Sequence, residues 1–268
     1  MEFSNKYILG FAFALCVACA SVVSFLAVQL KDIQEANRLL DRRLNVLRVA
    51  GVLEEGESLP KEEVNAFFEN GQVRYLVVDR DTGEELEDPS TLPDVKDAEN
   101  FDATKWAKEH AKVEGMTEPI PSEFKGTQIR HVPNYLQVIS VRTDEVDCLV
   151  LPIQGYGLWS TLRGYLAVSP DLSEVVGITY YEHGETAGLG GEVDNPRWKG
   201  QFPGKVIYAE DGSPKLTVTK AGMVTDPSYQ VDGMAGATIT TNGVDLMLEF
   251  WLGESGYGPY LKAQRADA

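Results

Sequence analysis

The sequence has little cysteine, little histidine and a shortage of positive charge. Three Cys and three His among 268 residues leave little material for a metal site built from thiolates and imidazoles. Lys and Arg number 24 against 41 Asp and Glu, so the formal net charge is −17. Nucleic-acid binding needs Lys and Arg patches, so this balance argues against a nucleic-acid partner. The length fits one medium domain with appendages, or two small domains.

Charge is absent from one long stretch near the N-terminus. Residues 7–30 carry no charged side chain, and about 20 apolar residues are enough to span the hydrocarbon of a membrane. A secretory signal is the alternative, with Lys6 before the apolar run and Ala18-Cys19-Ala20 as its cleavage site. Apolar residues continue well past that site, through residues 22–28. We therefore expect a retained membrane helix, with Cys16 and Cys19 as packing residues rather than a redox pair.

Residues 31–51 are expected to form a stalk helix that continues from the membrane. Gly51 lies where a helix C-cap is expected. Apolar residues recur at steps of three and four: Ile33, Ala36, Leu40, Leu44 and Leu47. We interpret this face as packed on the body or on another membrane protein. Four basic residues follow the apolar run and Lys6 alone precedes it. Long domains cross the membrane largely regardless of such charge, so this count does not settle on which side of the membrane the body lies.

The remaining residues, 52–268, are interpreted as one α+β domain, an antiparallel sheet with packed helices. Helices are expected over 61–70 and 103–112, and helical periodicity returns at Val244, Met247, Leu248 and Trp251. The acidic, proline-rich segment of about 84–123 is expected to be a solvated insertion without a calcium-binding loop. Strands are expected over 72–79, 146–153, 164–169, 175–181 and 205–209. Cys148 is expected to be a buried free thiol.

Three glycine-rich segments carry unusual chemistry. Residues 155–160 read GYGLWS, residues 182–191 read EHGETAGLGG, and residues 232–240 read DGMAGATIT. Glycine allows close backbone approach, and Trp159 offers a flat apolar face. The third segment precedes a predicted helix, whose free amide groups and positive dipole end favour a phosphate. Thr240 or Thr241 capping that helix is an alternative that can hold alongside the phosphate. Neither the Walker nor the Rossmann fingerprint is present.

The third segment resembles the Asp-x-x-Ser/Thr-Gly-Ala-Thr flavinylation motif. With HGETAGLGGEV and GYGLWS upstream, in this order, nearly the whole chain resembles the family of FMN-carrying subunits, designated C, of the Na⁺-translocating NADH:quinone oxidoreductase. The resemblance implies FMN esterified through its phosphate to Thr238 by a separate flavin transferase. Asp232, Gly236 and Ala237 fall on motif positions. Ala235 departs from the usual Ser/Thr, which removes one hydroxyl from the loop.

Further roles follow from the resemblance. Trp159 and Leu189 are expected to flank the isoalloxazine ring, and Thr240 to donate to the phosphate. Hydrogen bonds around the ring are expected from Ser160, Glu185, Thr186 and Gly190. Electron transfer requires distance and potential rather than proton abstraction, so no catalytic acid or base and no metal ligand is assigned. His183 is interpreted as stabilising its loop or as exposed.

The implied function is electron transfer within a six-subunit complex of the bacterial inner membrane. That complex oxidises NADH, reduces ubiquinone and exports Na⁺, and the FMN-carrying subunit by itself is not expected to be catalytic. The single-pass anchor would hold the FMN domain on the periplasmic side. One alternative is the homologous flavoprotein, designated G, of the ferredoxin:NAD⁺ oxidoreductase complex. Another is a tethered extracytoplasmic binding or scaffold module with an unmodified loop. Ala235 is the sequence feature that favours this alternative.

Overall fold

The protein is described by a computed structural model that covers residues 4–54 and 56–266. Its chain divides into two compact units, the first ending at Arg43 and the second beginning at Leu44. Helix α1 (Asn5–Val49) is continuous through residues expected to form the anchor and most of the stalk. Among the described residues it is the one helix long and apolar enough to cross a membrane, judged by length and composition.

The end of α1 follows the predicted C-cap. Gly51 has a φ of +80°, in the left-handed region that favours glycine. Its N–H donates to the carbonyl of Arg48 at 3.0 Å, and the N–H of Val52 donates to the carbonyl of Leu47 at 2.9 Å. This pair of bonds is a Schellman motif, which satisfies carbonyls that the helix end leaves free. The prediction that Gly51 ends the helix is confirmed.

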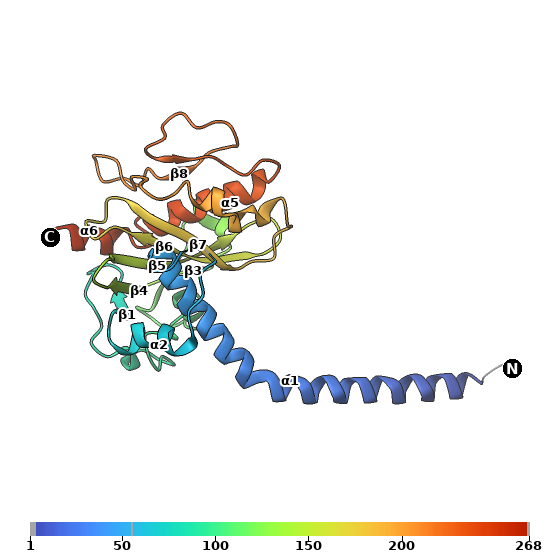
Figure 1. Ribbon diagram of the computed structural model, residues 1–268. Coiled ribbons are helices and arrows are strands. Elements are labelled where there is room, and N and C mark those ends of the chain that lie inside the picture. Colours follow the sequence, from blue (N-terminus) through green and yellow to red (C-terminus); the bar gives the residue numbers. More distant parts are fainter. Residues whose placement is uncertain (1–3, 55, 267–268) are drawn as a thin grey trace. The chain divides into compact units, whose positions relative to one another are not determined.

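The second unit is built on a five-stranded antiparallel sheet with the order β1-β4-β5-β6-β7 (Figure 1). The strands are β1 (Val73–Asp79), β4 (Tyr135–Arg142), β5 (Asp147–Tyr156), β6 (Thr161–Val168) and β7 (Val175–Glu182). Each strand alternates between two faces, and apolar side chains fill both of them. The predicted antiparallel sheet with packed helices is confirmed. Strand β4 is not among the strands predicted from the sequence, although Leu136, Val138 and Val141 are buried along it.

Helix α5 (Thr238–Leu252) packs on one face of the sheet. The predicted periodic residues Val244, Met247, Leu248 and Trp251 are all buried. A Cβ at Gly243 would lie 2.2 Å from the carbonyl oxygen of Tyr156, so only glycine lets the helix approach β5 this closely. The short strand β8 (Thr217–Val218) lies next to α5 (Figure 1) and pairs in parallel with β9 (Gln230–Val231). This packing places the start of α5 at the turn between β5 and β6.

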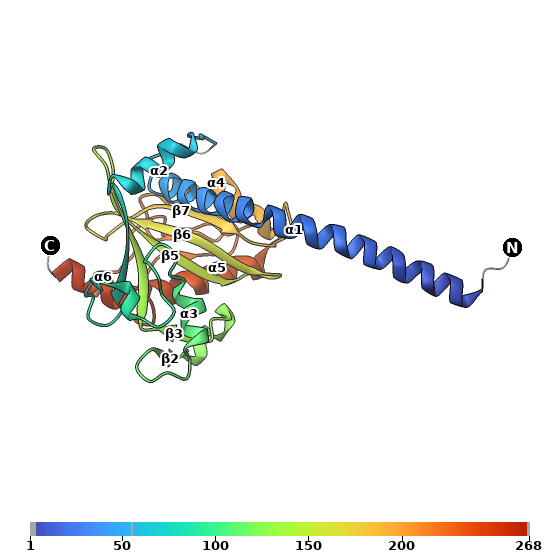
Figure 2. The same cartoon turned by 90° about the horizontal axis from the view of Figure 1, so that it is seen from below.

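The last turns of α1 pack on β7, with Val46, Leu47 and Val49 buried. A Cβ at Gly177 would lie 2.6 Å from the carbonyl oxygen of Val49, so helix and strand are in backbone contact. Helix α2 (Lys61–Glu69) lies beside β1, where the rings of Phe68 and Tyr75 stack. Helix α6 (Gly258–Ala266) ends the described chain (Figure 2). The part of the predicted stalk from Leu44 onward therefore belongs to the compact body.

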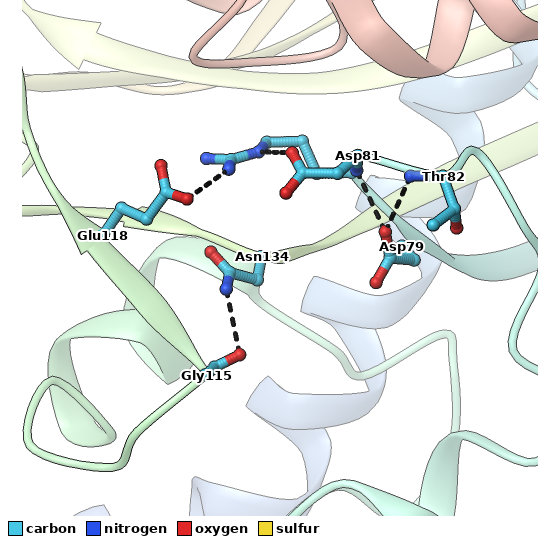
Figure 3. Close-up of polar contacts among 7 residues, drawn as sticks. Asp79, Asp81, Thr82, Gly115, Glu118 and Asn134 are labelled. Atoms are coloured by element: carbon cyan, nitrogen blue, oxygen red, sulfur yellow. Dashed lines mark hydrogen bonds and ion pairs between the residues drawn. The ribbon is translucent and has the colours of Figure 1, made fainter.

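The acidic insertion contains the expected helix, and most of its residues are exposed or half-buried, but the segment also folds around a small core. It contains η1 (Pro89–Thr91), α3 (Ala103–Glu109), β2 (Thr117–Pro119) and η2 (Ser122–Thr127), and β2 pairs with β3 (His131–Pro133). Leu92, Phe101 and Trp106 form a small core with Val77. Arg80 contacts Glu118 at 3.0 Å (Figure 3), and Arg163 contacts Asp102 at 3.0 Å. Apolar burial folds the insertion in spite of its acidic composition, and these ion pairs tether it to the sheet.

The strand expected over 205–209 is wrong. Val206 and Tyr208 form only isolated bridges, with Glu174 and Pro214. The segment contains apolar residues because Ile207 is buried in the core. In the described residues the segment pairs only through these isolated bridges, so no continuous strand forms. Two short helices precede this segment, η3 (Gly190–Asp194) and α4 (Pro196–Lys199).

Candidate functional site

The three glycine-rich segments meet around one pocket of about 270 Å³. The turn between β5 and β6, the loop after β7 and the start of α5 each contribute to its wall. The lining residues are Leu158, Trp159, Glu185, Thr186, Leu189, Gly190, Gly236, Ala237, Thr238, Ile239 and Thr240. Most residues predicted for the site are therefore brought together, whereas Ser160 and Asp232 do not line the pocket. Leu158 and Ile239 were not predicted, although both adjoin predicted residues in the sequence.

The start of α5 presents unpaired donors to this pocket. Ala237 is the N-cap residue and its side chain cannot cap. The first intrahelical bond runs from the N–H of Thr241 to the carbonyl of Ala237 at 2.9 Å. The amide groups of Thr238, Ile239 and Thr240 find no partner among the described residues. Free amides and the positive end of the helix dipole together favour an anion here. The exposed Thr238 side chain lies at the same helix end.

Capping by Thr240 or Thr241 is not what the structure shows. The Thr241 hydroxyl accepts from the N–H of Met234 at 3.1 Å, which orders the preceding loop instead. The Thr240 hydroxyl belongs to a residue that is 1 % exposed, and it donates to Glu185 at 2.7 Å. Its proton is therefore directed to a carboxylate. In this geometry Thr240 can donate to a phosphate only through its amide N–H.

Large apolar side chains form the pocket rim. Trp159 is 66 % exposed, Ile239 57 % and Leu189 45 %. Gly236 has a φ of +77°, and a Cβ there would lie 3.3 Å from Leu189 Cδ2, so a side chain would crowd the rim. Exposed apolar side chains gathered around a concave site mark a binding surface. The surface offers flat and aliphatic faces to an apolar ring.

Glu185 is the ionisable side chain of this pocket. Its carboxylate accepts from the N–H groups of Leu158 at 3.2 Å, Trp159 at 2.9 Å and Ser160 at 3.1 Å. Burial acts to raise the pKa of the carboxyl group, but hydrogen bonds from the Thr240 hydroxyl and the three amides outweigh it and lower the pKa. The carboxylate stays ionised and its acceptor sites are engaged within the protein.

The two predicted residues outside the pocket order its loops. The Ser160 hydroxyl accepts from the N–H of Gly184 at 2.6 Å. The Asp232 carboxylate accepts from the N–H of Gly222 at 2.6 Å, and its carbonyl accepts from the Trp198 indole at 2.9 Å. These bonds hold the ends of the site segments in place.

His183 stabilises its loop, as predicted. Its Nε2 lies 2.7 Å from an Asp194 carboxylate oxygen, and its Nδ1 accepts from the N–H of Glu185 at 3.2 Å. Cys148 is buried and free, as predicted, and burial raises the pKa of its thiol to about 12. Cys16 and Cys19 are exposed on α1. The described residues contain no group of three or more His, Cys, Asp or Glu placed to hold a metal ion.

Comparison with known proteins agrees with this geometry. The FMN-binding domain family matches residues 157–253, which begin at the β5–β6 turn and end just after α5. The Na⁺-translocating NADH-quinone reductase subunit designated C in Pseudomonas aeruginosa is 40 % identical over 256 residues, covering 93 % of this chain and 92 % of the relative. The subunit of the same name from Vibrio parahaemolyticus is 38 % identical, covering 98 % of this chain and 96 % of the relative.

A solved structure shares the fold. The crystal structure of Shewanella oneidensis NqrC matches with a TM-score of 0.71 and 28 % identity, covering 86 % of this chain and 99 % of that one. The relatives' names favour the Na⁺-translocating reductase over the ferredoxin-linked alternative. The chain therefore belongs to the NqrC family, the FMN-binding subunits of the multi-subunit Na⁺-translocating NADH-quinone reductase.

Proposed function

We propose that this protein is a membrane-anchored electron-transfer subunit that carries FMN as a phosphate ester on Thr238. One observation carries the proposal: the exposed Thr238 side chain stands on the rim of an apolar pocket, at a helix start where three amides have no partner in the part of the chain that the structure describes. The ester keeps one negative charge, which the amides and the helix dipole stabilise. Trp159 and Leu189 offer their apolar faces to the ring.

The open rim of the pocket supports a covalent link. Trp159, Ile239 and Leu189 on that rim are 66 %, 57 % and 45 % exposed. A ligand the size of FMN would remain partly exposed, and a bond to Thr238 would keep it from dissociating. FMN supplies a ring that accepts and donates electrons, while the residues around it hold its position and set its potential. An exposed ring edge also suits electron exchange with neighbouring subunits.

We further propose that the FMN domain stands on the periplasmic side of a bacterial inner membrane, in a complex that couples NADH oxidation and ubiquinone reduction to Na⁺ export. The candidate membrane helix and the names of the relatives support this setting. The partners would be the other subunits of a six-subunit complex, together with a flavin transferase that attaches FMN. Purification of the native complex and identification of its subunits test this assembly.

Flavin fluorescence in a denaturing gel tests the attachment. The chain is expressed with a flavin transferase, and we expect a fluorescent protein band that Thr238→Ala abolishes. Thr82→Ala is the matched control, because it removes the same kind of exposed side chain away from the pocket and should leave the band fluorescent. Full fluorescence in Thr238→Ala would place the bond elsewhere. A wild-type protein that never fluoresces would favour the tethered binding or scaffold module.

A further inference from the structure

The Glu185 carboxylate lies where two parts of the proposed flavin site meet. Its residue is 9 % exposed. One oxygen, Oε1, accepts from the amides of Trp159 and Ser160, and the other, Oε2, accepts from the amide of Leu158 and the Thr240 hydroxyl. The amides belong to the turn that carries Trp159, and the hydroxyl belongs to the first turn of α5, which carries Thr238. A single side chain therefore bonds both segments.

Two glycines pack their backbone against the same carboxylate. A Cβ at Gly157 would lie 2.6 Å from Glu185 Oε1. A Cβ at Gly190 would lie 2.6 Å from Oε2 and 2.5 Å from the Thr240 hydroxyl oxygen. Contacts this short would force something to shift, so the main chain closes around the carboxylate where a side chain would not fit. We call this arrangement of Glu185, the three amides, Thr240 and the two glycines the carboxylate cage.

The charge in the cage is held by dipoles. Amide and hydroxyl donors hold the carboxylate, and they stabilise its ionised form while fixing its direction. Protonation would convert one acceptor into a donor that faces other donors. The cage therefore requires the charged form, and it keeps one negative charge in the wall of the pocket.

We infer that Glu185 is a positioning residue, which fixes the Trp159 face relative to Thr238 and keeps its charge in the wall of the pocket. This inference rests on the proposed function and departs from the expectation that Glu185 hydrogen-bonds the flavin itself. Its acceptor sites serve the protein, so it acts through the turn and the helix. A fixed negative charge near a group that gains electrons opposes the gain, so Glu185 also lowers the reduction potential of the flavin.

The first test uses protein without flavin, prepared as Thr238→Ala. Amide hydrogen exchange is measured by NMR with and without Glu185→Gln. We expect exchange at Leu158, Trp159 and Ser160 to accelerate at least about tenfold, the equivalent of about 1.4 kcal/mol, while the amides of β5 and β6 keep their rates. Glu182→Gln is the matched control, because Glu182 is an exposed carboxylate on the same segment that contacts Arg163. Unchanged rates at the three amides, or equal acceleration throughout the sheet, would overturn the inference.

The second test uses the flavinylated full-length chain. We expect Glu185→Gln to raise the midpoint potential of the flavin. We expect Thr240→Val to keep the charge of Glu185 but to loosen the contact between the turn and α5. That loosening should change how strongly the flavin quenches the fluorescence of Trp159. Thr240→Ser keeps the hydroxyl and should match wild type. An unchanged potential in Glu185→Gln, or Thr240→Val and Thr240→Ser behaving alike, would contradict the inference. If wild type takes no flavin while the exchange result holds, the cage stands and the proposed function fails.

Discussion

Glu185 and Arg80 are both buried charges in the body, but different groups surround them. The Glu185 carboxylate accepts from three amides and one hydroxyl, all within the fold. The Arg80 guanidinium donates from Nε to Asp81 at 2.8 Å and from Nη2 to Glu118 at 3.0 Å (Figure 3). Those two carboxylates are 60 % and 53 % exposed, and the buried Nη1 of Arg80 has no partner among the described residues.

The two charges hold different parts of the protein in place. Main-chain amides bind Glu185, so its position dictates the path of the backbone at the pocket. Side chains bind Arg80, and loss of the guanidinium would leave Asp81 and Glu118 free to take water in its place. Arg80 thus contributes a replaceable tether between the insertion and the sheet. We expect the two regions to respond differently to equivalent changes.

The largest expected effect comes from replacing each charge by methionine. Glu185→Met leaves three amides and a hydroxyl aimed at an apolar group, which should lower the free energy of unfolding by about 3 kcal/mol or more. Arg80→Met removes two ion pairs whose partners can be hydrated, and should cost about 1–2 kcal/mol. Urea unfolding of both variants measures the difference. Equal losses would show that the two burial modes are equivalent.

A second prediction concerns glycine in the loop after β7. Gly190→Ala places a Cβ 2.6 Å from Glu185 and 2.5 Å from Thr240, and should cost about 2–3 kcal/mol through overpacking. Gly188 is the matched control, since a Cβ there meets nothing within 4 Å and only its φ of +76° resists substitution. Gly188→Ala should cost about 1 kcal/mol. Thermal unfolding compares the pair, and a smaller loss at Gly190 would contradict close packing at the cage.

Acid should weaken the carboxylate cage. The pKa of Glu185 is lowered in the folded state, so its contribution is present above the unfolded pKa of about 4.3 and is lost as pH falls through the folded value. The difference in unfolding free energy between wild type and Glu185→Gln should therefore shrink as pH falls below about 4. Unfolding series across this range provide the measurement. A difference that grows in acid would mean that folding raises the pKa of Glu185 instead of lowering it.

The smallest expected effect belongs to the exposed end of the Arg80 contact. Glu118→Gln keeps an acceptor on a side chain that is 53 % exposed, and should change the free energy of unfolding by less than about 1 kcal/mol. Added salt should reduce even that difference, because exposed pairs are screened. Urea unfolding at low and high salt checks both statements. A loss as large as that in Glu185→Met would remove the distinction between the two charges.

The sequence predicted which segments form the site better than it predicted how they are held together. Glycine density, Trp159 and a threonine-rich helix start are local features, and they identified the three segments that meet at the pocket. The role of Glu185 depends on amides 25 to 27 residues away in the chain, which no local pattern reveals. The segment over 205–209 was misread for the same reason: strand propensity is local, whereas a strand needs a neighbour with which to pair.

The folded insertion shows a related limit of composition. Its acidic and proline-rich sequence indicated solvent exposure, yet Leu92, Phe101 and Trp106 are spaced so that they meet only after the segment folds back on β1. Most strands of the sheet, by contrast, can be predicted from the sequence. They are bounded by turn residues, and apolar and polar side chains alternate along their length. Strand β4 was missed, so the five-stranded order became visible only in three dimensions.

Thr238 is the residue that we propose to carry FMN. Mass spectrometry of the full-length chain, expressed with a flavin transferase and digested, tests it most directly. We expect the peptide containing residues 232–240 to gain the mass of one FMN less one water. Fragmentation should assign the addition to Thr238, and the Thr238→Ala variant should show no addition. An unmodified wild-type peptide, or an addition on another residue, would contradict it.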